Sequence, residues 1–285
     1  MGDRGPTEPA RPSLARAHAE VMGVRLREAA QYRAAALAGV FTQVVFGFII
    51  FMTLDAFSIE LPARSPMTRP QLVSYVWLGQ AFLALLPWNL DRDVVQMLRT
   101  GTIAYELLRP LDLYTFWFCR TLGWRVAATT LRAVPLLAVV TLALRLVGLD
   151  AYALPPPPSW ASAAAFGLSF AVAVPLGIAL TLLIQITILW SLRVEGLVRV
   201  APVLVMAFGG MLVPLPMLPP GLAALLYALP FRGLVDAPYR AYSASLPPGE
   251  ALLAAGVSAA WLGALVWAGR ALLRRGVRNV VVHGG

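Results

Sequence analysis

The chain has 285 residues, of which 59% are hydrophobic and only 13% are charged. A soluble domain keeps roughly a quarter of its residues charged, so this composition excludes a soluble globule and predicts an integral membrane protein. The formal net charge of +9 does not indicate nucleic-acid binding, because the basic residues are all Arg and are divided among the segments between apolar blocks. One Cys and two His leave neither a disulfide framework nor a His/Cys metal site.

The N-terminal region is polar and Arg-rich, with no early apolar core, and predicts no cleavable signal peptide. Residues 1–12 contain three prolines and are expected to form a flexible tail. Residues 13–33 repeat apolar positions at roughly helical spacing among Arg side chains, which predicts an amphipathic helix lying on the inner membrane surface. A solvated tail leading into the first span is the alternative.

Six apolar stretches approach the roughly 20 residues that cross a ~30 Å hydrocarbon core: 34–54, 70–90, 126–144, 160–190, 197–213 and 251–269. The fourth begins at Trp160 because the four prolines before it cannot lie inside a helix. The third contains Arg132, which either faces protein or water or extends to the inner surface. The sequence thus predicts one all-α domain over residues 1–285, with a six-helix bundle at 34–270 and a tail at 271–285.

Arginine counts predict the orientation of this bundle. With the N-terminus inside, 17 Arg residues fall on the cytoplasmic side and 5 on the opposite side, so both termini are expected in the cytoplasm. Between the fifth and sixth spans, residues 214–245 contain a proline-broken apolar run, 215–231, whose part at 222–229 is too short to cross the bilayer and too apolar for a free loop. This run predicts a re-entrant helical hairpin on the outer side, with a buried plug as the alternative.

The loop at 91–112 is long for a connection between membrane helices and mixes charges with apolar residues. Asp91 is placed to cap a short helix, with Val94 and Leu98 on one face. Gly101 interrupts this helix, and Pro110 ends the segment that follows. The apolar stripe is expected to resume at Ile103, Leu107 and Leu111. We expect a short helical structure across the cytoplasmic mouth, with its charges exposed to a partner.

The run GTIAYELLRP at 101–110, continued by LDLY at 111–114 and then by Trp117 and Arg120, resembles the signature of the ABC-2 type transporter permeases. More narrowly, it is similar to the subgroup called ABC-2 family transporter proteins. The remaining chain resembles these permeases only in the order of its spans and in the proline-broken run before the last one. The resemblance implies that this segment is a coupling helix docking into a separate ATP-binding subunit. The alternative is an ordinary cytoplasmic loop whose charges only keep it solvated.

The resemblance implies docking roles for Gly101, Glu106, Arg109 and Pro110. The neighbouring charges complete the expected interface: Asp91, Arg92, Asp93 and Arg99, with Arg193 and Glu195 of the turn between spans four and five as a second contact. Four polar residues within spans are candidates to line a pathway: Gln43, Gln80, Thr181 and Gln185. Helix–helix hydrogen bonds are the other use of such residues.

The absence of Lys excludes a phosphate-binding loop ending in Gly-Lys-Ser/Thr, so we expect ATP and Mg²⁺ to be bound by a partner chain and expect no enzyme activity here. The sequence predicts a permease subunit of the bacterial inner membrane. We expect it to pair with a second permease copy or a related permease and with an ATP-binding subunit, and to bind no nucleic acid. Its cargo would be a lipophilic or amphipathic drug, lipid or glycoconjugate moved outward. The alternatives are an ion-coupled secondary transporter and, less favoured, a membrane-embedded enzyme.

Overall fold

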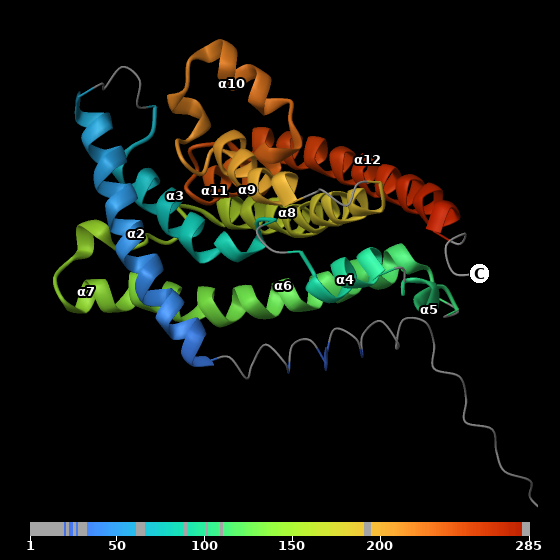
Figure 1. Ribbon diagram of the computed structural model, residues 1–285. Coiled ribbons are helices and arrows are strands. Elements are labelled where there is room, and N and C mark those ends of the chain that lie inside the picture. Colours follow the sequence, from blue (N-terminus) through green and yellow to red (C-terminus); the bar gives the residue numbers. More distant parts are fainter. Residues whose placement is uncertain are drawn as a thin grey trace, which may run out of the picture.

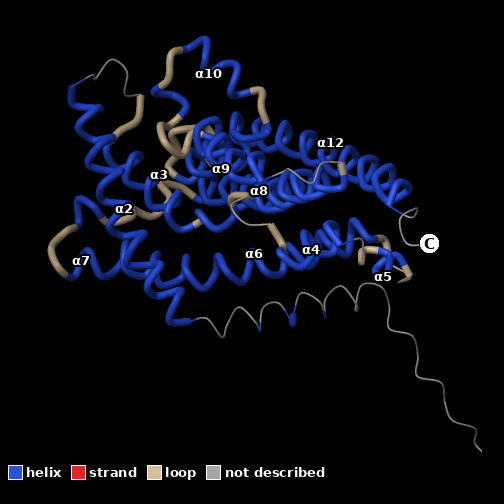
Figure 2. Tube along the Cα trace, in the orientation of Figure 1, coloured by secondary structure: helices blue, strands red, loops and turns tan. Residues whose placement is uncertain are grey.

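The protein folds as an all-helical bundle in the computed structural model, which describes residues 20, 23–24, 27, 33–60, 66–87, 90–100, 102–108, 111–190 and 195–280. Every regular element within these ranges is a helix (Figure 2). The tail predicted at 1–12 and most of the helix predicted at 13–33 lie outside the described residues, as do 281–285.

Four helices are long and apolar enough to cross a membrane, which confirms the transmembrane character (Figure 1). They are α2 (Arg33–Glu60), α6 (Leu113–Ala138, extended by a π-helical turn and by α7, Leu144–Leu146), α8 (Trp160–Ile186) and α12 (Pro248–Val280). Side chains cap two of them, because Asp112 accepts the Thr115 N–H at 3.0 Å and Ser159 accepts the Ser162 N–H at 3.1 Å.

The other two predicted spans contain shorter helices. Helix α3 (Arg69–Ala81) has 13 residues and α9 (Glu195–Gly209) has 15, so they are about 20 and 22 Å long, less than the hydrocarbon thickness. Within the stretch 70–90, the α-helix therefore ends at Ala81. Crossing by α3 and α9, and with it a six-span topology, stays a prediction.

A buried arginine caps the chain where the 3₁₀ turn that follows α3 ends. Proline disfavours helical backbone in the residue before it, and Leu86, which precedes Pro87, is extended, with φ −67° and ψ 156°. This break frees backbone carbonyls at the end of the 3₁₀ turn Leu83–Leu85. Arg125 of α6 donates through Nη1 to the oxygens of Leu85, at 2.7 Å, and Leu86. Its guanidinium thus caps the broken helix inside the protein, where a free carbonyl would be costly.

Helix α8 is the centre of the bundle. Its apolar stretch is 67% buried, whereas those of α2, α6 and α12 are each 28% buried. It packs along α12 and against α11 (Asp236–Tyr242). Helix α2 crosses α3 and α6, and the crossing with α3 is close because a Cβ added to Gly47 would lie 2.3 Å from the Trp77 ring.

Two short helices stand where the re-entrant hairpin is predicted. Helix α10 (Pro220–Tyr227) is largely exposed, whereas α11 is buried against α3, α8 and α12. Asp236 at the start of α11 is fully buried and lies 3.5 Å from Arg232 and 3.4 Å from Arg240. The segment therefore contains two short helices, and a re-entrant hairpin on the outer side stays a prediction.

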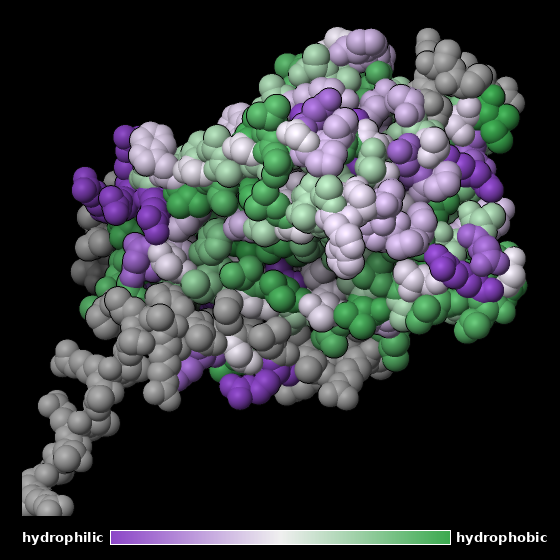
Figure 3. Space-filling model, turned by 180° about the vertical axis from the view of Figure 1, so that it is seen from behind, coloured by the Kyte–Doolittle hydropathy of each residue, from purple (hydrophilic) through white to green (hydrophobic). Residues whose placement is uncertain are grey.

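The two ends of the molecule differ. Helices α4 (Arg92–Thr100) and α5 (Ala104–Leu107) lie at the end where α12 finishes, and α7 and the last turns of α2 lie at the other (Figure 1). Seen from behind, the surface of the protein has strongly hydrophilic patches mainly toward its edges, with hydrophobic and near-neutral residues between them (Figure 3). This pattern fits a band of surface covered by lipid.

Candidate functional site

The segment 91–108, which we call the ledge, begins with a capped amphipathic helix. The Asp91 side chain accepts the backbone N–H groups of Asp93, at 3.1 Å, and Val94, at 3.4 Å. Val94 and Leu98 are buried, whereas Arg92 and Arg99 are exposed. The predicted cap and apolar face of this helix are confirmed.

An arginine clamp fastens the ledge to α6. Arg120 Nε lies 2.5 Å from Asp91 Oδ2, and its Nη2 lies 3.0 Å from Asp91 Oδ1 and 2.5 Å from Asp93 Oδ2. The Asp91 backbone N–H also donates to Gln185 of α8 at 3.4 Å. Paired contacts between a guanidinium and carboxylates hold a fixed geometry, so both acidic side chains bind within the chain.

Helix α5 turns Glu106 inward. Its side chain is only 8% exposed, and Oε2 accepts the indole N–H of the buried Trp117 at 2.9 Å. A buried indole N–H needs such a partner. The expectation that this carboxylate faces an ATPase is therefore corrected: Glu106 holds α5 against α6. Ile103 is buried as expected, but Leu107 is exposed because α5 is a single turn and does not continue the stripe.

The exposed tip of the ledge is apolar. Tyr105 is 73% exposed and Leu108 is 82% exposed. Sequence reasoning selected the charges of this motif and overlooked these two residues. Their spacing of three places them on one side of a helical turn, opposite Ile103 and Glu106. The spacing identifies Tyr105 and Leu108 as exposed only once the structure shows that Ile103 and Glu106 point inward.

The ledge lies against a part of α6 that is not needed to cross a membrane. The span that contains α6 runs over Leu113–Leu146, 34 residues, or about 51 Å, against a hydrocarbon core of ~30 Å. Val94, Leu98 and Ile103 share a buried cluster with residues from the first turns of α6 and from the ledge end of α8 and α12. This cluster joins the ledge to three long helices.

The remaining predicted interface residues are placed less fully. Gly101, Arg109, Pro110 and Arg193 lie outside the described residues. Glu195 is described only as the first residue of α9. Their docking roles stay predictions.

The four candidate pathway residues are buried and bond to neighbouring backbone or side chains. Gln43 of α2 donates to the backbone oxygen of Gln80 at 2.8 Å, which ties α2 to α3. Thr181 accepts from Arg125 at 2.8 Å and donates to Gly177 O at 2.7 Å. Gln43, Thr181 and Gln185 thus make contacts between elements through their side chains, and Gln80 does so through its backbone oxygen. The helix–helix alternative describes them better than a pathway lining.

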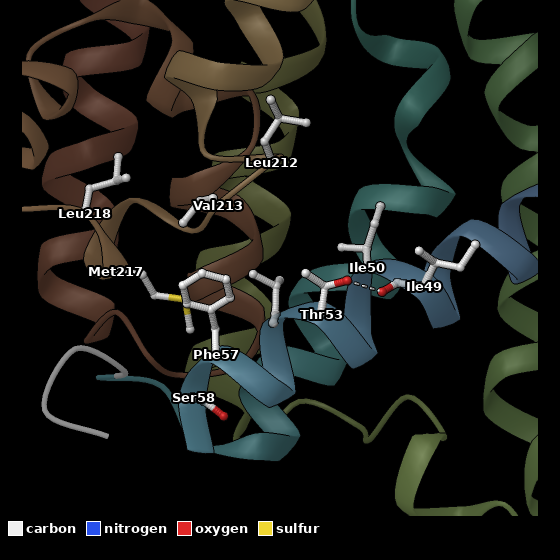
Figure 4. Close-up of a pocket in the computed structure, with 10 residues that line it drawn as sticks. Ile49, Ile50, Thr53, Phe57, Ser58, Leu212, Val213, Met217 and Leu218 are labelled. Atoms are coloured by element: carbon white, nitrogen blue, oxygen red, sulfur yellow. Dashed lines mark hydrogen bonds between the residues drawn. The ribbon is translucent and has the colours of Figure 1, made fainter. Parts of the chain in front are cut away.

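An apolar cavity of about 350 Å³ lies between α2 and the segment that follows α9 (Figure 4). Its walls include Ile50, Leu54 and Phe57 on one side and Val213 and Met217 on the other. Thr53, which also lines it, donates to the Ile49 carbonyl at 2.8 Å. The cavity therefore offers mainly hydrocarbon contacts, suited to an apolar group.

No family model and no curated protein matches this sequence. The resemblance to ABC-2 permeases therefore rests on the motif and on the pattern of spans.

Proposed function

We propose that this chain is the membrane subunit of an ABC-2-type exporter and that the ledge is its docking site for an ATP-binding subunit. The main observation behind this proposal is how the ledge is built. Its amphipathic helix is packed onto the bundle through Val94 and Leu98 and is bound to α6 by Arg120, and the segment ends in an exposed apolar tip. Exposed apolar residues rimmed by charge are typical of protein interfaces. Tyrosine at such a position is a common source of binding energy.

The contacts of the ledge suggest how force would pass into the membrane. Asp91 is held by α6 through Arg120 and by α8 through Gln185, and Glu106 is held by Trp117. A push on the ledge would move α6 and α8 together, because these contacts are buried or largely buried. In the proposed cycle, closure of the ATPase pair tilts the bundles from inward-open to outward-open.

The full assembly follows from the proposal. Helices α3 and α9 complete six spans, both termini and the ledge lie in the cytoplasm, and the α10–α11 hairpin lies on the outer side. A second permease copy or a related permease pairs with this chain in the inner membrane, and the ATPase subunits hold ATP and Mg²⁺. The apolar cavity beside α2 supports a lipophilic or amphipathic cargo, because drug-sized ligands bind in mainly apolar pockets of roughly 300 Å³ or more.

Site-specific crosslinking tests the docking role. A photoreactive amino acid replaces Leu108 in the full chain, in its native membrane, and crosslinked products are identified by mass spectrometry. The matched control carries the same group at Asp150, which is exposed at the opposite end. We expect Leu108 to capture a polypeptide with a Gly-Lys-Ser/Thr phosphate-binding loop, and Asp150 to capture none.

A functional measurement completes the test. Tyr105→Ala combined with Leu108→Asp should abolish stimulation of the captured ATPase by the reconstituted chain, whereas Asp150→Asn should leave it unchanged. Transport that requires a proton gradient and no ATPase would instead favour an ion-coupled transporter. Capture of no ATP-binding polypeptide at Leu108 would overturn the docking proposal.

A further inference from the structure

A second cavity, of about 280 Å³, lies beside the broken end of α3. Its lining includes Ala84, Leu86, Trp124, Arg125, Ala128 and Arg132. Helix α2 passes next to it, because a Cβ added to Gly39 would lie 3.4 Å from Arg132 Nε. Unlike the apolar cavity beside α2, it has two guanidinium groups and no acidic side chain in its lining.

The two arginines of this cavity differ in how they are bound. Arg125 is 1% exposed and gives its Nη donors to backbone carbonyls and Thr181. Arg132 is exposed and makes no hydrogen bond or ion pair with any residue in the described ranges. Trp124 is 37% exposed, and its indole N–H likewise has no partner in those ranges. The cavity therefore has positive charge and free N–H donors.

The position of the cavity along α6 places it near a membrane boundary. The uncharged stretches of α6 begin after Arg125, and Arg132 follows seven residues, or about 10 Å, further along. Side chains on a helix point toward its N-terminus, so the long Arg132 side chain extends back toward the ledge end. Its contact with Gly39, only six residues into α2, agrees with this depth. Tryptophan is also enriched at that level of a bilayer.

We propose that this cavity binds the phosphate group of an anionic phospholipid from the leaflet next to the ledge. Arg132 and the Trp124 indole would donate hydrogen bonds to the phosphate oxygens, and Arg125 would add charge from behind. Arginine suits phosphate because its planar fork presents parallel donors, and basic pockets between membrane helices bind anionic head groups. Among the residues that the structure describes, Arg132 would otherwise carry an unpaired charge within an apolar helix. The inference needs no ATPase partner and does not rest on the proposed function.

Lipid binding to the purified full chain tests the proposal. The probes are phosphatidylglycerol, which carries a net negative charge, and phosphatidylcholine, whose phosphate charge is offset by its amine. Bound lipid is counted by native mass spectrometry over a concentration series. Arg132→Gln should weaken phosphatidylglycerol binding about fivefold, equivalent to ~1 kcal/mol, and should leave phosphatidylcholine binding unchanged.

Three variants serve as controls. Arg275→Gln removes the same charge from an exposed position on the last turns of α12 and should bind phosphatidylglycerol like the wild type. Arg132→Lys should retain part of the preference, since a charge remains without the planar fork. Trp124→Phe should weaken binding less than Arg132→Gln. Unfolding midpoints in phosphatidylcholine show whether each variant is folded.

Two results would overturn the proposal. One is a loss of phosphatidylglycerol binding in Arg132→Gln no larger than in Arg275→Gln. The other is competition by soluble glycerol phosphate as effective as by the intact lipid, which would identify the ligand as a free phosphate and not a lipid.

Discussion

Replacing Arg125 with Met should destabilise the protein more than removal of any exposed arginine. The guanidinium donates to the buried ends of the broken α3 segment, at 2.7 Å to Leu85 O and also to Leu86 O. The Met variant leaves both carbonyls without this donor, and each unsatisfied buried group costs about 1–3 kcal/mol, so the expected loss is about 2–6 kcal/mol of unfolding free energy. Thr181 loses less, because its hydroxyl keeps the bond to Gly177 O.

The assay is reversible unfolding of purified protein in mixed micelles, followed by circular dichroism. Arg275→Met serves as the control, since it removes an exposed arginine from α12. Arg125→Lys should fall between the wild type and Arg125→Met, because a single ammonium cannot reach all the acceptors that the planar guanidinium reaches. Equal stability of the Arg125 and Arg275 Met variants would refute the capping role.

Two further substitutions test packing and capping. Gly47→Ala should cost about 1–3 kcal/mol of unfolding free energy, because the new methyl group meets the buried Trp77 ring. The control Gly167→Ala meets nothing within 4 Å and should be neutral or stabilising. Equal effects of the two changes would contradict the close crossing of α2 and α3. Burial alone would raise the pKa of Asp112, but hydrogen bonds from the Thr115 hydroxyl and backbone N–H, together with the charges of Arg270 and Arg274, outweigh it and lower the pKa. The contribution of the Asp112 carboxylate to stability is therefore complete above the ordinary pKa of an aspartate and is lost as the pH falls through the lowered value. Asp112→Asn should consequently flatten the acid side of a plot of melting temperature against pH. An unchanged acid side would count against this role of Asp112.

The long helices could be predicted because their signal is compositional. Uncharged stretches of about 20 residues and the proline run before Trp160 suffice to place α2, α8 and α12. The stretch predicted at 126–144, which contains Arg132, covers only part of the span, because α6 already begins at Leu113. The end of α3 could not be predicted with the same rule. The 70–90 stretch is uniformly apolar, and the cap that permits its break comes from Arg125, 39 residues beyond Leu86. Apolar length does not reveal such a distant partner.

The ledge could be predicted in part. The cap at Asp91 and the buried Val94 and Leu98 follow from local spacing, and the structure confirms them. The inward turn of Glu106 depends on its contact with Trp117, which lies 11 residues further along on another helix. The resemblance to ABC-2 permeases implied a docking role for Glu106, and only the packing of α5 shows that Tyr105 and Leu108 are exposed.

Cysteine labelling in cells tests the central claim, that the ledge faces the cytoplasm at the opposite end from the α7–α8 connection. In a Cys119→Ser background, which removes the single native thiol, Leu108→Cys and Asp150→Cys are treated with a membrane-impermeant maleimide. The account predicts labelling of Asp150→Cys in intact cells or spheroplasts and of Leu108→Cys only in inside-out vesicles. Labelling of Leu108→Cys from the outside, or of both variants from one side, would contradict it.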